Sequence, residues 1–123
     1  MTPPVALFGM CFGAEMGWRV ITRREPVLAA LWYGIGPEPE DVGLIRTPVL
    51  AAYAQDDARV NDTLDDLCDA LAGSDVDFRL ESFPGTVHAF ADHTRPDRHR
   101  PAPAAVLWDE MLDFLRGTDD APG

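Results

Sequence analysis

The stretch "VALFGMCFGAEMGW", residues 5–18, is an apolar run that reaches Gly-x-Cys-x-Gly and then changes period. Residues 5–8 have the composition of a short buried strand. After Gly9 the apolar and small residues recur at helical spacing, at Gly13, Met16, Gly17, Val20 and Ile21. The stretch therefore predicts a strand that turns sharply into a helix at Cys11. That cysteine is either a nucleophile held on the turn or a small buried thiol beside a glycine turn.

The rest of the chain alternates strand and helix patterns. Residues 26–36 ("PVLAALWYGIG") and 48–54 ("PVLAAYA") are continuous apolar runs, typical of strands covered on both faces of a parallel sheet. Residues 77–83 ("DFRLESF") alternate like a half-buried edge strand. A helix is expected to begin at an N-cap, Asn61 or Asp62, and to end at Gly73; its apolar positions are Leu64, Leu67, Cys68 and Leu71. A final helix has apolar positions at Trp108, Met111, Leu112 and Leu115.

This alternation predicts one α/β domain, a mostly parallel sheet with flanking helices, over residues 1–117. Residues 118–123 are expected to form a flexible tail. Cys68 lies on an apolar helical stripe and is expected in the core, and Trp18, Trp32 and Trp108 are expected to pack in the core or in a groove.

Composition excludes several kinds of partner. The 123 residues include 21 acidic and 10 basic side chains, a net charge of −11, which argues against binding to nucleic acid or to an anionic membrane surface. Two cysteines are too few for a disulfide framework. The N-terminal apolar run of eight residues, 5–12, is too short for a membrane span and lacks the basic flank of a signal peptide. A cytoplasmic protein with free thiols is expected.

Three reactive side chains follow predicted strands. In open α/β sheets, ligands bind beyond the carboxyl ends of the strands. Cys11, Asp57 and His88 fall there, in the nucleophile–acid–histidine order of α/β-hydrolases. His88 would accept the thiol proton, Asp57 would orient the imidazole, and the helix that follows Cys11 would lower the thiol pKa. The adjacent Asp56 is an alternative acid, or either aspartate caps the next turn; the register of the preceding strand favours Asp57.

Three motifs in this order resemble the dienelactone hydrolase family. They are "GMCFGA" (9–14), "PVLAAYAQDD" (48–57) and "FPGTVHAF" (83–90). The family has a G-x-C-x-G-G turn, an aspartate after a P-V-L strand and a histidine in P-G-x-x-H-x-F. "LWYGIGPE" and "AAVLWDEMLDFL" also fall where the family has a strand and its last helix. The resemblance covers most of residues 5–116 and implies a partial α/β-hydrolase fold, the C-terminal half of the family domain.

The resemblance also implies an activity. The chain would hydrolyse an ester or lactone through a thioester on Cys11, with Asp57 and His88 completing the triad and the Phe12 N–H stabilising the oxyanion. Neither a cofactor nor a metal is required for this chemistry. Ala14 replaces the second glycine of the turn, and Asp92 stands where the dienelactone-cleaving enzyme has an arginine. The second difference argues against dienelactone itself as the substrate.

The resemblance does not extend to the N-terminal half of the family fold. In the family, that half supplies several strands, a second backbone amide for the oxyanion and part of the substrate pocket. Strand 5–8 then needs cover, because it has no charge or proline to guard an edge. A second copy of the chain or a separate N-terminal segment would supply that cover.

Other functions compete with hydrolysis. A non-catalytic remnant that pairs through its sheet edge, and a redox-sensing or acyl-carrying thiol, are the alternatives. A dinucleotide turn is rejected, because Cys11 stands where its glycine is needed and Tyr33-Gly34 supplies no acid. His93 and His99 are expected to be solvated in the polar loop, and the histidines form no metal-binding pair.

Overall fold

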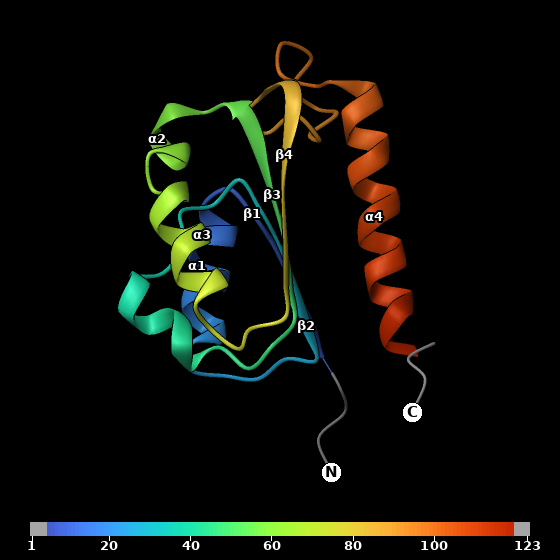
Figure 1. Cartoon of the computed structure of the whole chain (residues 1–123). Coiled ribbons are helices and arrows are strands. Elements are labelled where there is room, and N and C mark those ends of the chain that lie inside the picture. Colours follow the sequence, from blue (N-terminus) through green and yellow to red (C-terminus); the bar gives the residue numbers. More distant parts are fainter. Residues whose placement is uncertain (1–4, 120–123) are drawn as a thin grey trace.

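The computed structural model describes residues 5–119 and contains four strands and their connecting helices (Figure 1). The elements in chain order are β1 (Ala6–Met10), α1 (Phe12–Ile21), β2 (Leu28–Trp32), the 3-10 helix η1 (Pro39–Leu44), β3 (Val49–Asp56), α2 (Ala58–Asn61), α3 (Leu64–Ala72), β4 (Phe78–Val87) and α4 (Pro101–Asp119). All neighbouring strands pair in parallel, in the order β1-β2-β3-β4. The predicted α/β class is confirmed.

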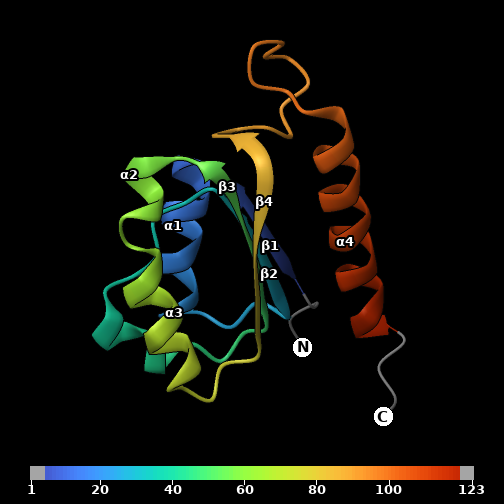
Figure 2. The same cartoon turned by 45° about the horizontal axis from the view of Figure 1, so that its top comes forward.

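The two faces of the sheet are covered by different numbers of helices. Helices α1, α2 and α3 lie against one face, and α4 alone lies along the other (Figures 1 and 2). Each face has its own apolar cluster: Trp18 and Leu67 belong to the one beneath α1 and α3, and Trp32 and Leu107 to the one beneath α4. None of the described helices is long and apolar enough to cross a membrane.

The central strands are buried, as their apolar runs predict. Every residue of β2 is buried, and so are the first six of β3. Trp18 and Trp32 are wholly buried. A continuous apolar strand is stable only where both faces are packed, and helices on both sides of the sheet meet that requirement here.

Strand β1 differs from its prediction. It is an edge strand, and Phe8 and Met10 are 43% and 39% exposed. Its apolar composition correctly predicted a strand, but the burial was wrong, because among residues 5–119 no element packs on its outer side. Trp108, expected to pack in the core or in a groove, is 39% exposed and its ring lies 4.8 Å from that of Trp32. Cys68, expected in the core, is only half-buried.

Helix α3 ends at the C-cap Gly73 as predicted, but other helix boundaries differ from the prediction. Asn61 does not cap α3; its side-chain amide instead donates to the Ala54 carbonyl at 2.8 Å, and Thr63 takes the N-cap position. The intervening helix α2 was not predicted. Helix α4 continues through Asp119, two residues into the expected tail. The rest of that tail, residues 120–123, lies outside the described residues.

Candidate active site

Cys11 occupies the junction between β1 and α1. Its φ and ψ are 57° and −122°, a region that non-glycine residues rarely adopt. Its N–H donates to the Trp32 carbonyl at 2.9 Å, and its carbonyl accepts from the N–H groups of Ala14 and Glu15. Backbone strain of this kind persists only where the surroundings fix it, and it is frequent at functional sites. The strand-to-helix turn predicted at Cys11 is confirmed.

Of the two glycines that flank Cys11 in the Gly-x-Cys-x-Gly sequence, Gly9 and Gly13, only Gly9 is required for packing. A Cβ at Gly9 would lie 2.5 Å from the Gly13 carbonyl oxygen, so β1 and α1 can approach only because Gly9 has no side chain. A Cβ at Gly13 would meet no atom within 4 Å. Gly13 therefore has no packing role of this kind, since that position faces open space.

His88 and Asp57 are in direct contact. The His88 Nδ1 and the Asp57 Oδ2 lie 2.5 Å apart. The side chains are 26% and 9% exposed, so the pair is partly shielded from water. Asp57 stands at the N-cap position of α2, but its carboxylate makes no cap hydrogen bond. The Asp57 carboxylate therefore contacts His88 and not the start of α2, whereas Asp56 is exposed at the end of β3.

The sheet register explains this contact. Asp56 pairs with Val87 across β3 and β4, so the next residues along each strand, Asp57 and His88, emerge side by side. A register shift after Ala54 accompanies this approach. Buried Thr86 holds the irregular segment, because its hydroxyl accepts from the Gln55 N–H at 3.1 Å and donates to the Phe83 carbonyl.

Two more strained residues lie at the same edge. Within residues 5–119, the non-glycine residues with positive φ are Cys11, Tyr33 and Ala89. Tyr33 follows β2 and its ring centroid is 5.4 Å from that of His88. Its buried hydroxyl accepts from the Ala91 N–H at 3.1 Å, and burial raises its pKa. Tyr33 is therefore an uncharged side chain that packs beside His88. The sequence did not indicate this position, because "WYG" is typical only of the end of a strand.

The electrostatic setting of Cys11 differs from the expectation of a lowered pKa. Partial burial raises the pKa of the thiol above its ordinary value, and the carboxylates of Asp57 and Asp92 raise it further. The guanidinium groups of Arg95 and Arg98 act in the opposite direction but do not outweigh burial. The predicted lowering is wrong, because a sequence does not show how far the sulfur is removed from water.

The loop after β4 brings charged residues near Cys11. Asp92 accepts hydrogen bonds from the backbone and hydroxyl of Thr94, and it contacts Arg95 with a 3.3 Å ion pair. These bonds lower the pKa of the Asp92 carboxyl. Arg98 donates to the His88 carbonyl at 3.4 Å. The loop was predicted to be solvated, and nothing in its composition singled out Arg95 as a neighbour of the sulfur.

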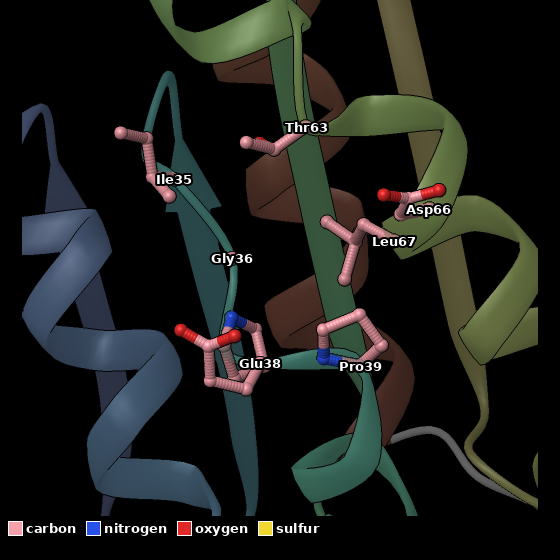
Figure 3. Close-up of a pocket in the computed structure, with 8 residues that line it drawn as sticks. Ile35, Gly36, Glu38, Pro39, Thr63, Asp66 and Leu67 are labelled. Atoms are coloured by element: carbon pink, nitrogen blue, oxygen red, sulfur yellow. The ribbon is translucent and has the colours of Figure 1, made fainter.

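A separate pocket lies between the segment that follows β2 and the start of α3. Figure 3 shows this cavity of about 170 Å³, which the segment after β2, η1 and α3 enclose. Its lining includes Ile35, Leu67 and the carboxylates of Glu38 and Asp66. None of its lining residues is Cys11, Asp57 or His88. The pocket is therefore distinct from the candidate site.

Comparison with known proteins identifies the family of the chain. The model of the dienelactone hydrolase family matches residues 2–118. The chain belongs to the dienelactone hydrolase family. The resemblance stated from the three motifs is thus confirmed, and so is the implied fold.

Individual relatives are about twice as long. The chain is 28% identical over 113 residues to a Saccharolobus solfataricus protein and over 126 residues to a Yersinia pestis protein, both named "Putative carboxymethylenebutenolidase". These matches cover 91% and 93% of this chain but 44% and 47% of the relatives. The chain therefore spans about half the length of the curated relatives it matches.

Solved structures have the same fold over about half of their own length. A Klebsiella pneumoniae structure described as a "Putative Dienelactone Hydrolase" superposes with a TM-score of 0.80 at 22% identity, over 90% of this chain and 51% of that one. The dienelactone hydrolase-like promiscuous phosphotriesterase P91, from metagenomic libraries, superposes with a TM-score of 0.76 at 22% identity, over 91% and 51%. Both similarities concern the fold.

Proposed function

We propose that Cys11, His88 and Asp57 are the nucleophile, base and orienting acid of an ester or lactone hydrolase. The observation that carries the proposal is the 2.5 Å contact between His88 Nδ1 and Asp57 Oδ2, at the sheet edge where Cys11 is held with positive φ. Membership of a hydrolase family supports it. A histidine oriented by a buried carboxylate beside a strained nucleophile turn is the arrangement that acyl transfer requires.

The first half of the reaction forms a thioester. The raised pKa of the Cys11 thiol means that sulfur carries its proton at neutral pH. Proton transfer to the free ring nitrogen of His88, Nε2, therefore accompanies attack of sulfur on the substrate carbonyl carbon. Asp57 accepts from Nδ1–H and stabilises the imidazolium. The tetrahedral intermediate then expels the alkoxide, which takes the proton from His88.

The second half of the reaction restores the enzyme. Water gives a proton to His88 Nε2 and its oxygen attacks the thioester carbonyl. The second tetrahedral intermediate releases the carboxylic acid and the Cys11 thiolate, which recovers the proton from His88. For a lactone, alcohol and acid remain on one product molecule.

The oxyanion in both halves lies near the start of α1. Phe12 is the first residue of the helix, and the first N–H groups of a helix have no intrahelical acceptor. We assign the Phe12 N–H as one oxyanion donor. Because it is a backbone group, its loss cannot be tested by truncating the side chain, which is 69% exposed. One such donor contributes a factor of about 10²–10³ in rate.

The experiment compares each candidate residue with a matched partner elsewhere in the chain. Hydrolysis of p-nitrophenyl acetate is measured together with the intact mass of the acylated protein. Cys11→Ala should abolish acylation, and His88→Ala and Asp57→Asn should slow it by about 10³-fold or more. The controls are Cys68→Ala and His93→Ala, which change a half-buried thiol and an exposed loop histidine. Acylation retained in Cys11→Ala, or equal losses in the controls, would refute the assignment.

A further inference from the structure

Tyr33 lies between the segments that carry the candidate nucleophile and the candidate base. It directly follows β2, which pairs with β1 on one side and with β3 on the other, and it is 1% exposed. The carbonyl of the preceding residue, Trp32, accepts from the Cys11 N–H at 2.9 Å, and the Tyr33 N–H donates to the Ala52 carbonyl at 2.8 Å. The backbone at Tyr33 is therefore tied to the Cys11 turn on one side and to β3 on the other.

The side chain of Tyr33 reaches the segment that carries His88. Its ring centroid lies 5.4 Å from that of His88, with the ring planes at 58°, and 5.4 Å from that of Phe90, with the planes at 70°. Its hydroxyl accepts from the Ala91 N–H at 3.1 Å. One buried side chain thus contacts residues on both sides of Ala89.

Ala89 is the strained residue of this segment. Its φ is 67°, in the left-handed region, where the Cβ of an alanine crowds the backbone. Such a conformation persists only where the surrounding contacts hold it. The Ala89 carbonyl accepts from the Asp92 N–H, a bond within the same turn. The Tyr33 hydroxyl comes from the end of β2, so its bond to the Ala91 N–H ties the strained turn to the sheet.

The orientation of the imidazole depends on this tie. His88 follows β4 directly and precedes Ala89, so a change in the turn would move its ring. The Asp57 carboxylate holds Nδ1, but a single hydrogen bond leaves the ring free to turn about the line that joins the two atoms. The Tyr33 ring packed beside the imidazole restricts that rotation. Both contacts together fix the direction of Nε2, the nitrogen that receives the thiol proton in the proposed mechanism.

We propose that Tyr33 is a positioning residue for the His88 base. Its ring restricts the imidazole and its hydroxyl holds the turn that follows, so that Nδ1 stays on Asp57 and Nε2 keeps one direction. Tyr33 is buried and acts through His88, without contact to the substrate. The assignment of His88 as a base rests on the proposed function, whereas the fixing of the imidazole by Tyr33 does not.

The test compares two buried tyrosines. Tyr33→Phe keeps the ring and removes the hydroxyl. Tyr53→Phe is the control, because Tyr53 is also 1% exposed and its hydroxyl donates to the Gly34 carbonyl at 3.0 Å. Tyr53 belongs to the apolar cluster beneath α1 and α3, and Tyr33 to the one beneath α4. Each variant loses one buried hydrogen bond, so a loss of stability alone would affect both alike.

The first readout is heteronuclear NMR of the imidazole nitrogens, which distinguishes the two ring tautomers and requires no activity. The His88 signals are assigned by their absence from His88→Ala. In the wild-type chain, His88 should be held as the Nδ1–H tautomer. In Tyr33→Phe the Nδ1 proton should exchange with water about tenfold faster, the effect of one net hydrogen bond, and in Tyr53→Phe it should not. Tyr33→Leu, which also removes the aromatic ring, should speed the exchange further.

The second readout is hydrolysis of p-nitrophenyl acetate. A misplaced base slows the chemical step without weakening substrate binding, so kcat should fall about 10–100-fold in Tyr33→Phe at an unchanged KM. Tyr53→Phe should keep kcat near the wild-type value.

Three results would overturn the proposal. They are an unchanged exchange rate of the His88 Nδ1 proton in Tyr33→Phe, equal changes in Tyr33→Phe and Tyr53→Phe, and a raised KM at constant kcat, which would make Tyr33 a substrate contact. The proposed function fails separately. If the Nδ1 proton exchanges faster in Tyr33→Phe but hydrolysis by the wild-type chain does not depend on Cys11, the catalytic assignment is wrong and the role of Tyr33 in fixing the imidazole stands.

Discussion

Replacing Gly9 by alanine tests how closely β1 and α1 must approach at the candidate nucleophile. The added Cβ would lie 2.5 Å from the Gly13 oxygen, 2.7 Å from its carbonyl carbon and 2.9 Å from the Ala14 nitrogen. Ordinary contact begins at 3.4 Å, so strand and helix must separate by nearly an ångström. All three neighbours are backbone atoms, which no rotamer change can move. We expect a loss of about 3 kcal/mol, the upper end of overpacking costs, or roughly 150-fold in the unfolding equilibrium constant.

Urea unfolding followed by tryptophan fluorescence measures this loss, because Trp18 and Trp32 are wholly buried in the folded chain. The midpoint should fall by about 1–3 M. Gly13→Ala is the matched control: its Cβ meets open space within a helix, so it should stabilise the chain by up to about 1 kcal/mol. If Gly9→Ala unfolds at the wild-type midpoint, or if the two variants lose equal stability, the packing argument fails.

Three further predictions concern titration and buried polar groups. The rate of Cys11 alkylation by iodoacetamide should rise with pH to a midpoint above that of a free cysteine, and Arg95→Gln should move it higher. A midpoint at or below that of a free cysteine would contradict the burial of the sulfur. Burial and the neighbouring Glu81 raise the pKa of Glu110 to about 7. The folded state therefore holds this proton more tightly than the unfolded chain, so stability should fall as pH rises from about 4.5 to 7, and Glu110→Gln should flatten that part of a Tm–pH curve. Tyr33→Phe removes the acceptor of the buried Ala91 N–H and should cost about 1–3 kcal/mol in thermal unfolding, whereas an unchanged Tm would show that the N–H finds another partner.

The sequence predicted the central strands of the sheet better than its edge strand β1 and the short helix α2. Apolar runs located β2 and β3 because burial on both faces demands such composition. The same reasoning placed β1 in the interior, whereas it lies at the edge of the sheet, because apolar composition does not show whether a strand has one neighbour or two. Helix α2 was missed because four residues are too few to show a period.

For the candidate site, spacing predicted which residues share an edge but little of their setting. The contact between Asp57 and His88 depends on a strand register that a P-V-L stretch can suggest. The position of Arg95 depends on a loop with no periodic pattern, and the raised pKa of Cys11 depends on desolvation. Both arise only when distant segments fold together.

The candidate catalytic residues lie in segments that are expected to differ in the free energy of local opening. The candidate acid–base pair follows β3 and β4, which are joined by seven residue pairs, while the candidate nucleophile follows β1, which is joined to β2 by five. Both β1 and β4 are edge strands, but β1 has the fewer pairs. Edge segments open locally at a lower free energy than the whole domain unfolds. Detachment of β1 would carry the sulfur away and leave the imidazole–carboxylate pair intact. Turnover would then scale with the fraction of molecules whose edge strand is closed, so the same active-site residues would report a conformational equilibrium as well as a chemical step.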